Sequence, residues 1–391
     1  MTAHRSDGWA TPVAAGLVTA VVGFTSSFAV VLAGLRAVGA DGADAASGLL
    51  VLSLTMGLGC VGFALLTRRP VTLAWSTPGA ALLAVQTVPE GGWPAAVGAF
   101  VLTGVALTLT GLLPPLSRLV EQIPTSVASA MLAGVLLSLC LVPFRLLPDE
   151  PLAIGAVVGS WVLVTCLSAR WATPAAVVAA LVVMAVDGSY GAVAWSQTAP
   201  SLTWTTPQWS WQAVVALALP LYLVTMTSQN IPGIATMRSL GYDVPVRTAL
   251  GYSGTATALG APFGGHAINL SAIAAALSAG PEAGRDPSRR WVAALTCGLG
   301  YVAFGLAANA VVALAGAAPA GLFAAVAGVA LLGSFAAATS QALAHESGRV
   351  AAGVTLVVAA SGVTLGGIGS AFWALVVGCT LHAVTSRTRR G

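Results

Sequence analysis

The sequence predicts an all-α polytopic membrane protein with 14 transmembrane segments, arranged as two inverted seven-span repeats (7+7). Three observations support this prediction. Of the 391 residues, 57% are hydrophobic and only 7% are charged, whereas about 25% are charged in an ordinary soluble domain. Apolar segments close to the 20 or so residues that span a bilayer recur along the whole chain. The arginines also divide unequally between the loops on the two sides of such a bundle.

Each half of the chain contains seven apolar segments bounded by polar or helix-breaking residues. The first set lies near residues 12–34, 45–66, 72–88, 93–116, 124–142, 151–169 and 173–190. The second set lies near residues 211–234, 245–259, 264–280, 290–316, 319–340, 350–368 and 370–386. No polar stretch between them is long enough to build a soluble domain.

The arginine distribution tests the span count and the orientation together. All 16 basic residues are arginines. With a cytoplasmic N-terminus, 14 of them fall in cytoplasmic segments, and only Arg36 and Arg145 fall outside. This bias matches the positive-inside rule and predicts that both termini are cytoplasmic. The arginines occur singly or in twos and threes between apolar runs, which argues against a nucleic-acid partner and leaves the lipid bilayer as the surroundings.

A weak internal repeat divides the chain in two. Residues 25–40 (TSSFAVVLAGLRAVGA) and 227–242 (TSQNIPGIATMRSLGY) share Thr, Ser, Ala, Arg and Gly at an offset of 202. Because seven is an odd number, the second copy enters the membrane from the opposite side, as in inverted-repeat transporters. We therefore expect one repeat over residues 1–195 and the other over 196–391, with the boundary in the polar, Trp-rich stretch 191–210.

The third span of each repeat is interrupted, which predicts half-helices in spans 3 and 10, each preceded by a short extended strand. In the first repeat, residues 76–79 (STPG) follow the extended run 71–75. In the second, residues 257–263 are expected to be extended, and Pro262, Gly264 and Gly265 break the chain before a helix over 267–279. Ten helical residues rise about 15 Å, half of the hydrocarbon core.

Both half-helices should therefore begin near the midplane, with their N-termini converging on one point. Unpaired N–H groups and two positive dipole ends make such a point an anion site. The alternative is that Pro and Gly merely kink two ordinary spans.

His266 is expected at the start of the second half-helix. All 12 acidic residues and the other three histidines fall in loops or at span ends, so His266 is the only titratable side chain expected near the midplane. Burial and the two dipoles favour a neutral imidazole, and a bound carboxylate favours the protonated one. Anion and proton would then each strengthen the other's binding, as proton-coupled uptake requires. The alternative is a neutral packing histidine held by a hydrogen bond.

Polar and aromatic residues around the two breaks complete the predicted substrate site. Asn269 lies three residues after His266, which on a helix would place both on one face. The candidate substrate-binding residues are Ser26, Ser27, Phe28, Thr77, Pro78, Gly79, Gln229, Asn230, Phe263, Gly264, Gly265, His266 and Asn269. The polar residues could instead join helices, and the two phenylalanines could be core residues rather than partners of an aromatic ring. The five cysteines show no metal-ligand spacing, so we expect no metal and no cofactor apart from the coupling proton.

Several strings carry a resemblance to a known family. They are AWSTPGAAL from Ala74, TMTSQNIPG with the following RSLGY, APFGGHAINLSAIAAALSAGPEA, and DPSRRW. Together they resemble the benzoate transporter (BenE) family, along essentially the whole chain. The resemblance implies uptake of benzoate with protons across the bacterial inner (plasma) membrane.

The resemblance also implies a fold similar to that of uracil permease and SulP-type transporters. In that fold, spans 1–4 and 8–11 form a core domain, spans 5–7 and 12–14 form a gate domain, and spans 1, 3, 8 and 10 hold the substrate. Related proteins dimerise, so a homodimer is compatible with it. Nucleobase permeases place acidic residues on spans 8 and 10, where this chain has Gln229 and His266. This difference favours an anionic substrate.

The leading prediction is therefore a secondary active transporter that takes up benzoate or a similar aromatic carboxylate with protons. The core domain would move against the gate domain by an elevator or rocking displacement. A transporter of another anion or of a nucleobase, and a passive anion channel, are the alternatives. An enzyme is not expected, because the sequence has no HExxH, no GxSxG and no paired carboxylates inside a span.

Overall fold

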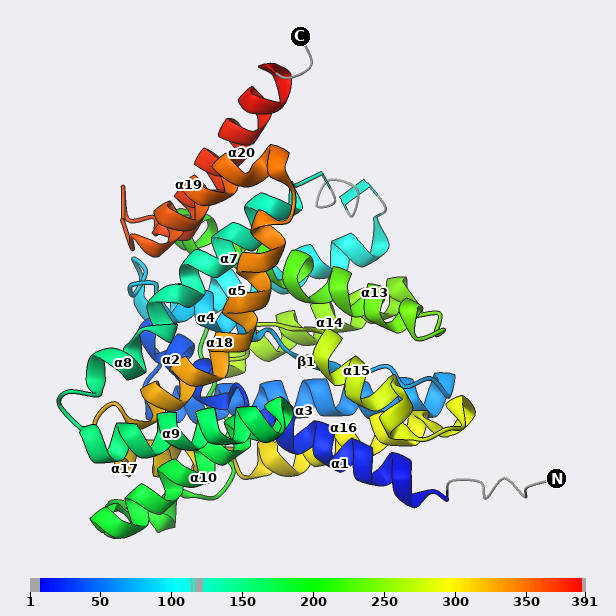
Figure 1. The fold of residues 1–391 in the computed structure, drawn as a ribbon, viewed down its shortest axis with the longest axis vertical. Helices are drawn as coiled ribbons and strands as arrows, with labels where there is room; N and C mark the ends of the chain where they lie inside the picture. Colours follow the sequence, from blue (N-terminus) through cyan, green and yellow to red (C-terminus); the bar gives the residue numbers. More distant parts are fainter. Residues whose placement is uncertain (1–7, 114, 117–121, 389–391) are drawn as a thin grey trace.

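Helices form nearly all of the regular structure in the computed structural model, which describes residues 8–113, 115–116 and 122–388 (Figure 1). In the first half of the chain the elements are α1 (Ala10–Thr25), α2 (Phe28–Ala37), α3 (Gly42–Thr67), β1 (Leu73–Trp75), α4 (Thr77–Ala84), α5 (Gly92–Leu112), α7 (Thr125–Cys140), α8 (Val142–Leu146), α9 (Pro151–Leu167), α10 (Ala169–Asp187), η1 (Ser189–Ala192) and η2 (Trp195–Gln197). In the second half they are α11 (Trp211–Ala213), η3 (Val214–Ala218), α12 (Leu219–Thr225), η4 (Met226–Asn230), α13 (Ile231–Ser239), α14 (Val246–Gly260), η5 (Ala261–Phe263), β2 (Ile268–Leu270), α15 (Ala272–Ala279), η6 (Pro281–Ala283), η7 (Pro287–Arg289), α16 (Trp291–Leu306), α17 (Ala308–Ala317), α18 (Leu322–Leu343), η8 (Glu346–Gly348), α19 (Arg349–Ala360) and α20 (Ser370–Thr388). The elements η3 and η4 are π-helical, and the other η elements are 3₁₀ turns.

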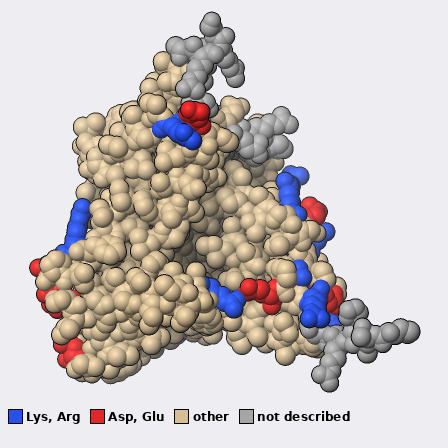
Figure 2. Space-filling view, in the orientation of Figure 1, with Lys and Arg blue, Asp and Glu red and all other residues tan. Residues whose placement is uncertain are grey.

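The helices are those of a polytopic membrane protein. Among the described residues, seven helices are long and apolar enough to cross a membrane, or eight if the pair Pro287–Leu306 and Ala308–Ala317, bent by 54°, forms one span. Three shorter apolar helices accompany them, in α9, α19 and α20. Charged side chains form only a few small clusters on the face shown in Figure 2, with broad uncharged areas between them. The prediction of a mostly helical, polytopic membrane protein is thus confirmed.

The first half-helix begins where the sequence predicts it. The side chain of Ser76 caps α4 by accepting a hydrogen bond from the backbone N–H of Gly79 at 3.2 Å. Proline at the second helical position suits this cap, because the missing N–H would have no partner inside the helix.

The second half-helix begins later than predicted. Residues 257–263, expected to be extended, complete α14 and form the turn η5, and the strand β2 follows the break instead of preceding it. Helix α15 then starts at Ala272, after Ser271 accepts a hydrogen bond from the N–H of Ala274 at 3.2 Å. The prediction of a helix from residue 267 is wrong because residues 268–270 pair with β1 across the molecule, a contact that no local pattern shows.

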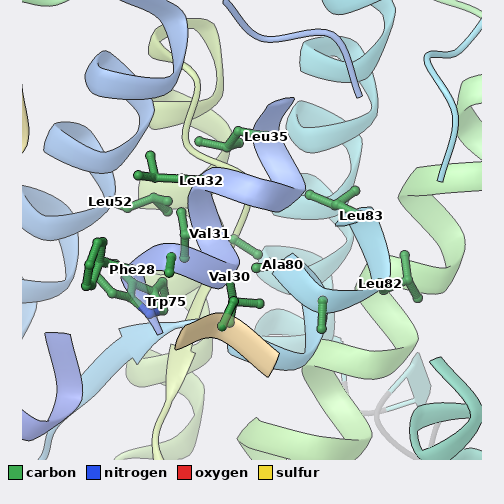
Figure 3. Close-up of a cluster of buried hydrophobic side chains, with 14 of the residues drawn as sticks. Phe28, Val30, Val31, Leu32, Leu35, Leu52, Trp75, Ala80, Leu82 and Leu83 are labelled. Atoms are coloured by element: carbon green, nitrogen blue, oxygen red, sulfur yellow. The ribbon is translucent and has the colours of Figure 1, made fainter. Parts of the chain in front are cut away.

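Close backbone approach holds the half-helix α4 in place. A Cβ atom at Gly34 of α2 would lie 2.4 Å from the carbonyl oxygen of Ala80, so only glycine permits this crossing. Buried apolar side chains of both helices surround the contact, among them Val31 and Leu83 (Figure 3). Packing of this kind supplies the protein surroundings that a broken helix needs inside a bilayer.

Close backbone approach also joins α5 to α14, and two glycines of α14 give a matched pair of variants that tests it. A Cβ at Gly254 would lie 2.2 Å from the backbone nitrogen of Thr108, whereas a Cβ at Gly251, on the same helix, meets nothing within 4 Å. We expect Gly254→Ala to destabilise the protein by about 1–3 kcal/mol through overpacking. Gly251→Ala should leave stability unchanged or raise it by up to about 1 kcal/mol. Thermal unfolding of both purified variants measures the difference; equal melting temperatures would contradict the packing described.

Candidate functional site

A two-stranded antiparallel sheet connects the two half-helices. Trp75 pairs with Ile268 and Leu73 pairs with Leu270. The N–H of Ser76 donates to the carbonyl of Ala267 at 2.9 Å, and this bond extends the ladder to the cap of α4. Because β1 and β2 run in opposite directions, the helices that follow them also leave the sheet in opposite directions.

Both half-helix N-termini line one small, partly open cavity of about 100 Å³. Its lining residues come from α1, α3, β1, α4, η4, α15, α16 and α18 and the segments between them. They are Thr19, Gly23, Ser26, Ser27, Met56, Ala74, Trp75, Thr77, Gln229, Ser271, Ile273, Ala274, Leu277, Tyr301, Ala330, Leu331 and Ser334. None of these residues carries a charge, so the partial positive charges of the two helix ends are the main fixed charges that face the cavity.

Breaks in two long helices bring further polar groups to the cavity. Ser26 and Ser27 interrupt the path from α1 to α2, and each hydroxyl donates to the carbonyl of Gly23 at 3.2 Å. The Ser27 hydroxyl also accepts a hydrogen bond from Trp75 Nε1 at 2.7 Å. In the second half of the chain, the π-helical turn η4 presents Gln229 at the cavity. π-Helical turns of this kind are frequent at functional sites.

The structure brings four of the predicted site residues to the cavity wall, namely Ser26, Ser27, Thr77 and Gln229. Within the described part of the chain, the Thr77 and Gln229 side chains make no hydrogen bond, which leaves both available to a ligand.

Three other candidates support the site without lining this cavity. The Asn230 side chain accepts from the N–H of Leu270 at 3.0 Å, which ties η4 to β2. The Asn269 amide hydrogen-bonds the backbone of Ser76 and Leu270 when its oxygen faces the Ser76 N–H. Gly79 supplies the N–H that the cap of α4 binds.

Pro78 lines a larger cleft next to the cavity, and four other candidates line neither the cavity nor that cleft. Phe28 is buried and stacks on Phe24, with ring centroids 5.7 Å apart. Phe263 contacts the ring of Trp204, 5.2 Å away. Gly264 adopts a left-handed φ of 92° that turns the chain into β2, and Gly265 follows it.

His266 is fully buried and lies outside the residues that line the cavity. Its Nε2 is 3.1 Å from the carbonyl oxygen of Ser76. A carbonyl can only accept, so Nε2 carries the hydrogen and a neutral ring has a bare Nδ1. Nδ1 has no hydrogen-bond partner among the described residues. The expectation that His266 and Asn269 share a helix face is wrong, because both precede α15 and Asn269 belongs to β2.

Several cavity residues were missed from the sequence. Ser271 caps α15 as Ser76 caps α4, and a strand followed by Ser could have revealed it. Tyr301 and Ser334 lie within the long helices α16 and α18, where no local pattern distinguishes them from other residues of the span.

A larger cleft of about 640 Å³ adjoins the cavity and shares Gln229, Ile273 and Ser334 with it. One wall is formed by α7 and α18, and the other by η4, α13 and α15. The cleft extends to Thr125 and Gln341, the latter near the end of α18. Figure 2 shows a hollow near the centre of its face, where α18 and α15 lie in Figure 1.

Loops at the end of the bundle opposite this cleft form hydrogen bonds with one another. In the extended stretch before α11, the N–H of Thr205 donates to the carbonyl of Pro262 at 2.7 Å, and the N–H of Gln208 donates to the carbonyl of Pro94 at 2.9 Å. Thr203 N–H donates to the hydroxyl of Ser47 at 2.9 Å. This stretch therefore crosses the loop ends of several helices.

Comparison with known proteins gives consistent results. The family model described as benzoate membrane transport protein (BenE) matches residues 7–384. The inner membrane protein YdcO of Escherichia coli (strain K12) is 36% identical over 376 residues, which cover 95% of this chain and 94% of that protein. The benzoate membrane transport protein of Acinetobacter baylyi is 27% identical over 336 residues, 85% of each chain.

Solved structures share the fold at low sequence identity. The transmembrane domain of the cyanobacterial bicarbonate transporter BicA matches with a TM-score of 0.59 at 12% identity, over 96% of each chain. The murine anion transporter Slc26a9 in its inward-facing state matches with a TM-score of 0.63 at 14% identity, over 100% of this chain and 69% of that one.

Proposed function

Because the chain belongs to the benzoate membrane transport protein (BenE) family and its relatives and fold are those of membrane transporters rather than enzymes, we propose that it takes up benzoate or a similar aromatic carboxylate with protons. The observation that carries the proposal is the uncharged polar cavity at two half-helix N-termini. Helix N-termini favour anions, and among the described residues no carboxylate lines this cavity to take that role.

An aromatic wall suits the ring of such a substrate. Trp75 lines the cavity, and Phe24 packs against it with centroids 5.3 Å apart. Phe24 in turn stacks on Phe304 at 4.7 Å. Aromatic side chains favour offset or edge contacts with another ring, so this cluster offers the apolar half of a site whose other half is polar.

The coupling proton is assigned to Nδ1 of His266. The opposite ring nitrogen is held by the Ser76 carbonyl, and Ser76 caps the half-helix whose next residue, Thr77, lines the cavity. Protonation of the ring and binding of an anion at the end of α4 would thus be linked over a short path.

We further propose 14 spans with both termini in the cytoplasm of a bacterium and the chain in its inner membrane. Loops that the arginine rule assigns to the cytoplasm contact one another, as in the ion pairs Arg69–Asp243 and Arg170–Glu282. Loops assigned to the outside do the same, as in the bond from Thr205 to Pro262. A loop placed on the wrong side would break this agreement.

The helix contacts also fit two inverted repeats, residues 1–195 and 196–391. Helix α3 contacts α16, and α14 contacts α5. Because α3 and α14 are the second spans of the two repeats, and α5 and α16 are the fourth spans, the two contacts are equivalent between the repeats. In this scheme, the core domain comprises spans 1–4 and 8–11, and the gate domain spans 5–7 and 12–14. The cleft between α7 and α18 on one side and α13 and α15 on the other follows the boundary between them.

Transport would then proceed by displacement of the core domain against the gate domain. In the conformation described, the cleft runs toward the end assigned to the cytoplasm, while loops cover the outer end. A homodimer of this chain remains part of the proposal.

A different small anion is the second candidate substrate, since BicA is described as a bicarbonate transporter and Slc26a9 as an anion transporter.

The test is uptake of labelled benzoate into proteoliposomes under an inward pH gradient, with protein-free liposomes subtracted because neutral benzoic acid crosses lipid. We expect concentrative uptake that excess unlabelled benzoate blocks and that uracil, sulfate and bicarbonate do not. Protein-dependent uptake of labelled bicarbonate or sulfate, with none of benzoate, would favour the second candidate. Uptake of labelled uracil alone would favour a nucleobase transporter, and conductance without accumulation would favour a channel.

A further inference from the structure

We infer that Tyr301 is a substrate-binding residue whose phenolic hydroxyl donates a hydrogen bond to the carboxylate of the substrate, an inference that rests on the proposed function. Tyr301 belongs to α16, is only 1% exposed, and lines the cavity together with Thr77 and Ser271 at the half-helix N-termini. Its hydroxyl has no hydrogen-bond partner among the described residues. A buried hydroxyl without a partner is costly, so one carried by a side chain that lines a cavity indicates a partner that enters from outside the chain.

The neighbours of the hydroxyl explain why the protein itself does not satisfy it. It stands against α1, where a Cβ at Gly23 would lie 2.2 Å from the phenol oxygen. The carbonyl of Gly23 already accepts from Ser26 and Ser27. The thiol of Cys297, one helical turn earlier in α16, interacts with the phenol, but sulfur is a weak acceptor and completes no hydrogen bond of normal geometry.

The chemistry of the missing partner follows from the cavity. A phenol donates one hydrogen, and a carboxylate, which only accepts, is its natural complement. The two helix ends attract the same negative charge, so phenol and helices would bind one group together. A hydrogen bond to an ionised acceptor is about twice as strong as one between neutral groups.

The experiment compares Tyr301→Phe with Tyr252→Phe. Each variant removes only a hydroxyl from a core-domain tyrosine. The Tyr252 hydroxyl donates to the carbonyl of Thr55 at 2.7 Å and lies outside the cavity lining. Benzoate uptake in proteoliposomes gives KM, and thermal unfolding without substrate gives stability.

For Tyr301→Phe we expect KM for benzoate to rise about tenfold or more, with no loss of thermal stability, because the lost bond exists only with substrate bound. For Tyr252→Phe we expect the reverse: a lower melting temperature and an unchanged KM. A second variant, Gly23→Ala, pushes against the hydroxyl and should raise KM as well, whether or not the first variant folds.

Unchanged KM in Tyr301→Phe, with a wild type that accumulates benzoate, overturns the inference while the proposed function stands. A lower melting temperature in Tyr301→Phe with unchanged KM would likewise assign the hydroxyl to structure. Failure of the wild type to transport benzoate would refute the proposed function, and the inference with it.

Discussion

Replacement of His266 by glutamine is expected to abolish uptake driven by a pH gradient while benzoate exchange continues. The glutamine amide can still donate to the Ser76 carbonyl, which the imidazole binds at 3.1 Å, but it cannot take a proton at the position of Nδ1. One coupled proton supports about tenfold accumulation per pH unit, because one unit is worth 1.36 kcal/mol. In the variant this accumulation should fall to the equilibrium level.

Two assays on the same proteoliposomes separate coupling from folding. Counterflow of labelled against unlabelled benzoate reports a functional site, and gradient-driven uptake reports coupling. His382→Gln is the control, since that histidine lies in α20 and also has a buried Nδ1 without a partner among the described residues. It should behave as wild type. Gradient-driven accumulation that survives in His266→Gln would remove the histidine from the coupling mechanism.

Replacement of Gln229 by glutamate should abolish uptake of an anionic substrate. Gln229 lines both the cavity and the cleft, and none of the described residues that line the cavity is charged. Two like charges about 4 Å apart near a protein surface repel by about 4 kcal/mol. We expect benzoate affinity to fall about a hundredfold or more. The defect should be largest at high pH, where the new carboxyl is ionised, and should lessen as pH falls and the carboxyl becomes neutral.

Gln341→Glu is the matched control, because Gln341 is exposed at the far end of the cleft, where solvent screens the same charge. Measurement of KM against pH for both variants gives the comparison. Equal defects in the two variants would mean that Gln229 is no nearer to the bound anion than Gln341 is. A gain of uracil uptake in Gln229→Glu would support the view that the missing carboxyl excludes nucleobases from the wild type.

The long apolar segments were predictable because hydrophobicity over a span is a local property. The first half-helix was predictable for a similar reason, since Ser76 and Pro78 form a recognisable helix start. The start of the second half-helix was predicted too early, because Pro262 and Gly264 are typical helix-breaking residues and lie eight or more residues before the helix begins at Ala272. What separates them is β2, and its partner strand is almost 200 residues away in the sequence.

The candidate site was predictable only in part. Residues at breaks, such as Ser27 and Gln229, have a local signal, and both line the cavity. His266 lies behind the cap of α4 and away from the cavity because it packs against Ser76 and Phe100. Residue spacing in the sequence does not reveal these contacts. Tyr301 reaches the cavity from the middle of α16 because Gly23 leaves room for its hydroxyl, a relation between two distant helices.

Calorimetry of benzoate binding shows whether the anion and the proton bind this protein cooperatively. Titration of the purified protein with benzoate near pH 7, in two buffers of different ionisation enthalpy, gives the number of protons taken up per benzoate bound. Carboxylates are ionised at this pH, so the ligand brings no proton with it. We predict net proton uptake by the wild type and none by His266→Gln. Benzoate binding by the wild type without proton uptake would contradict cooperative binding of the two.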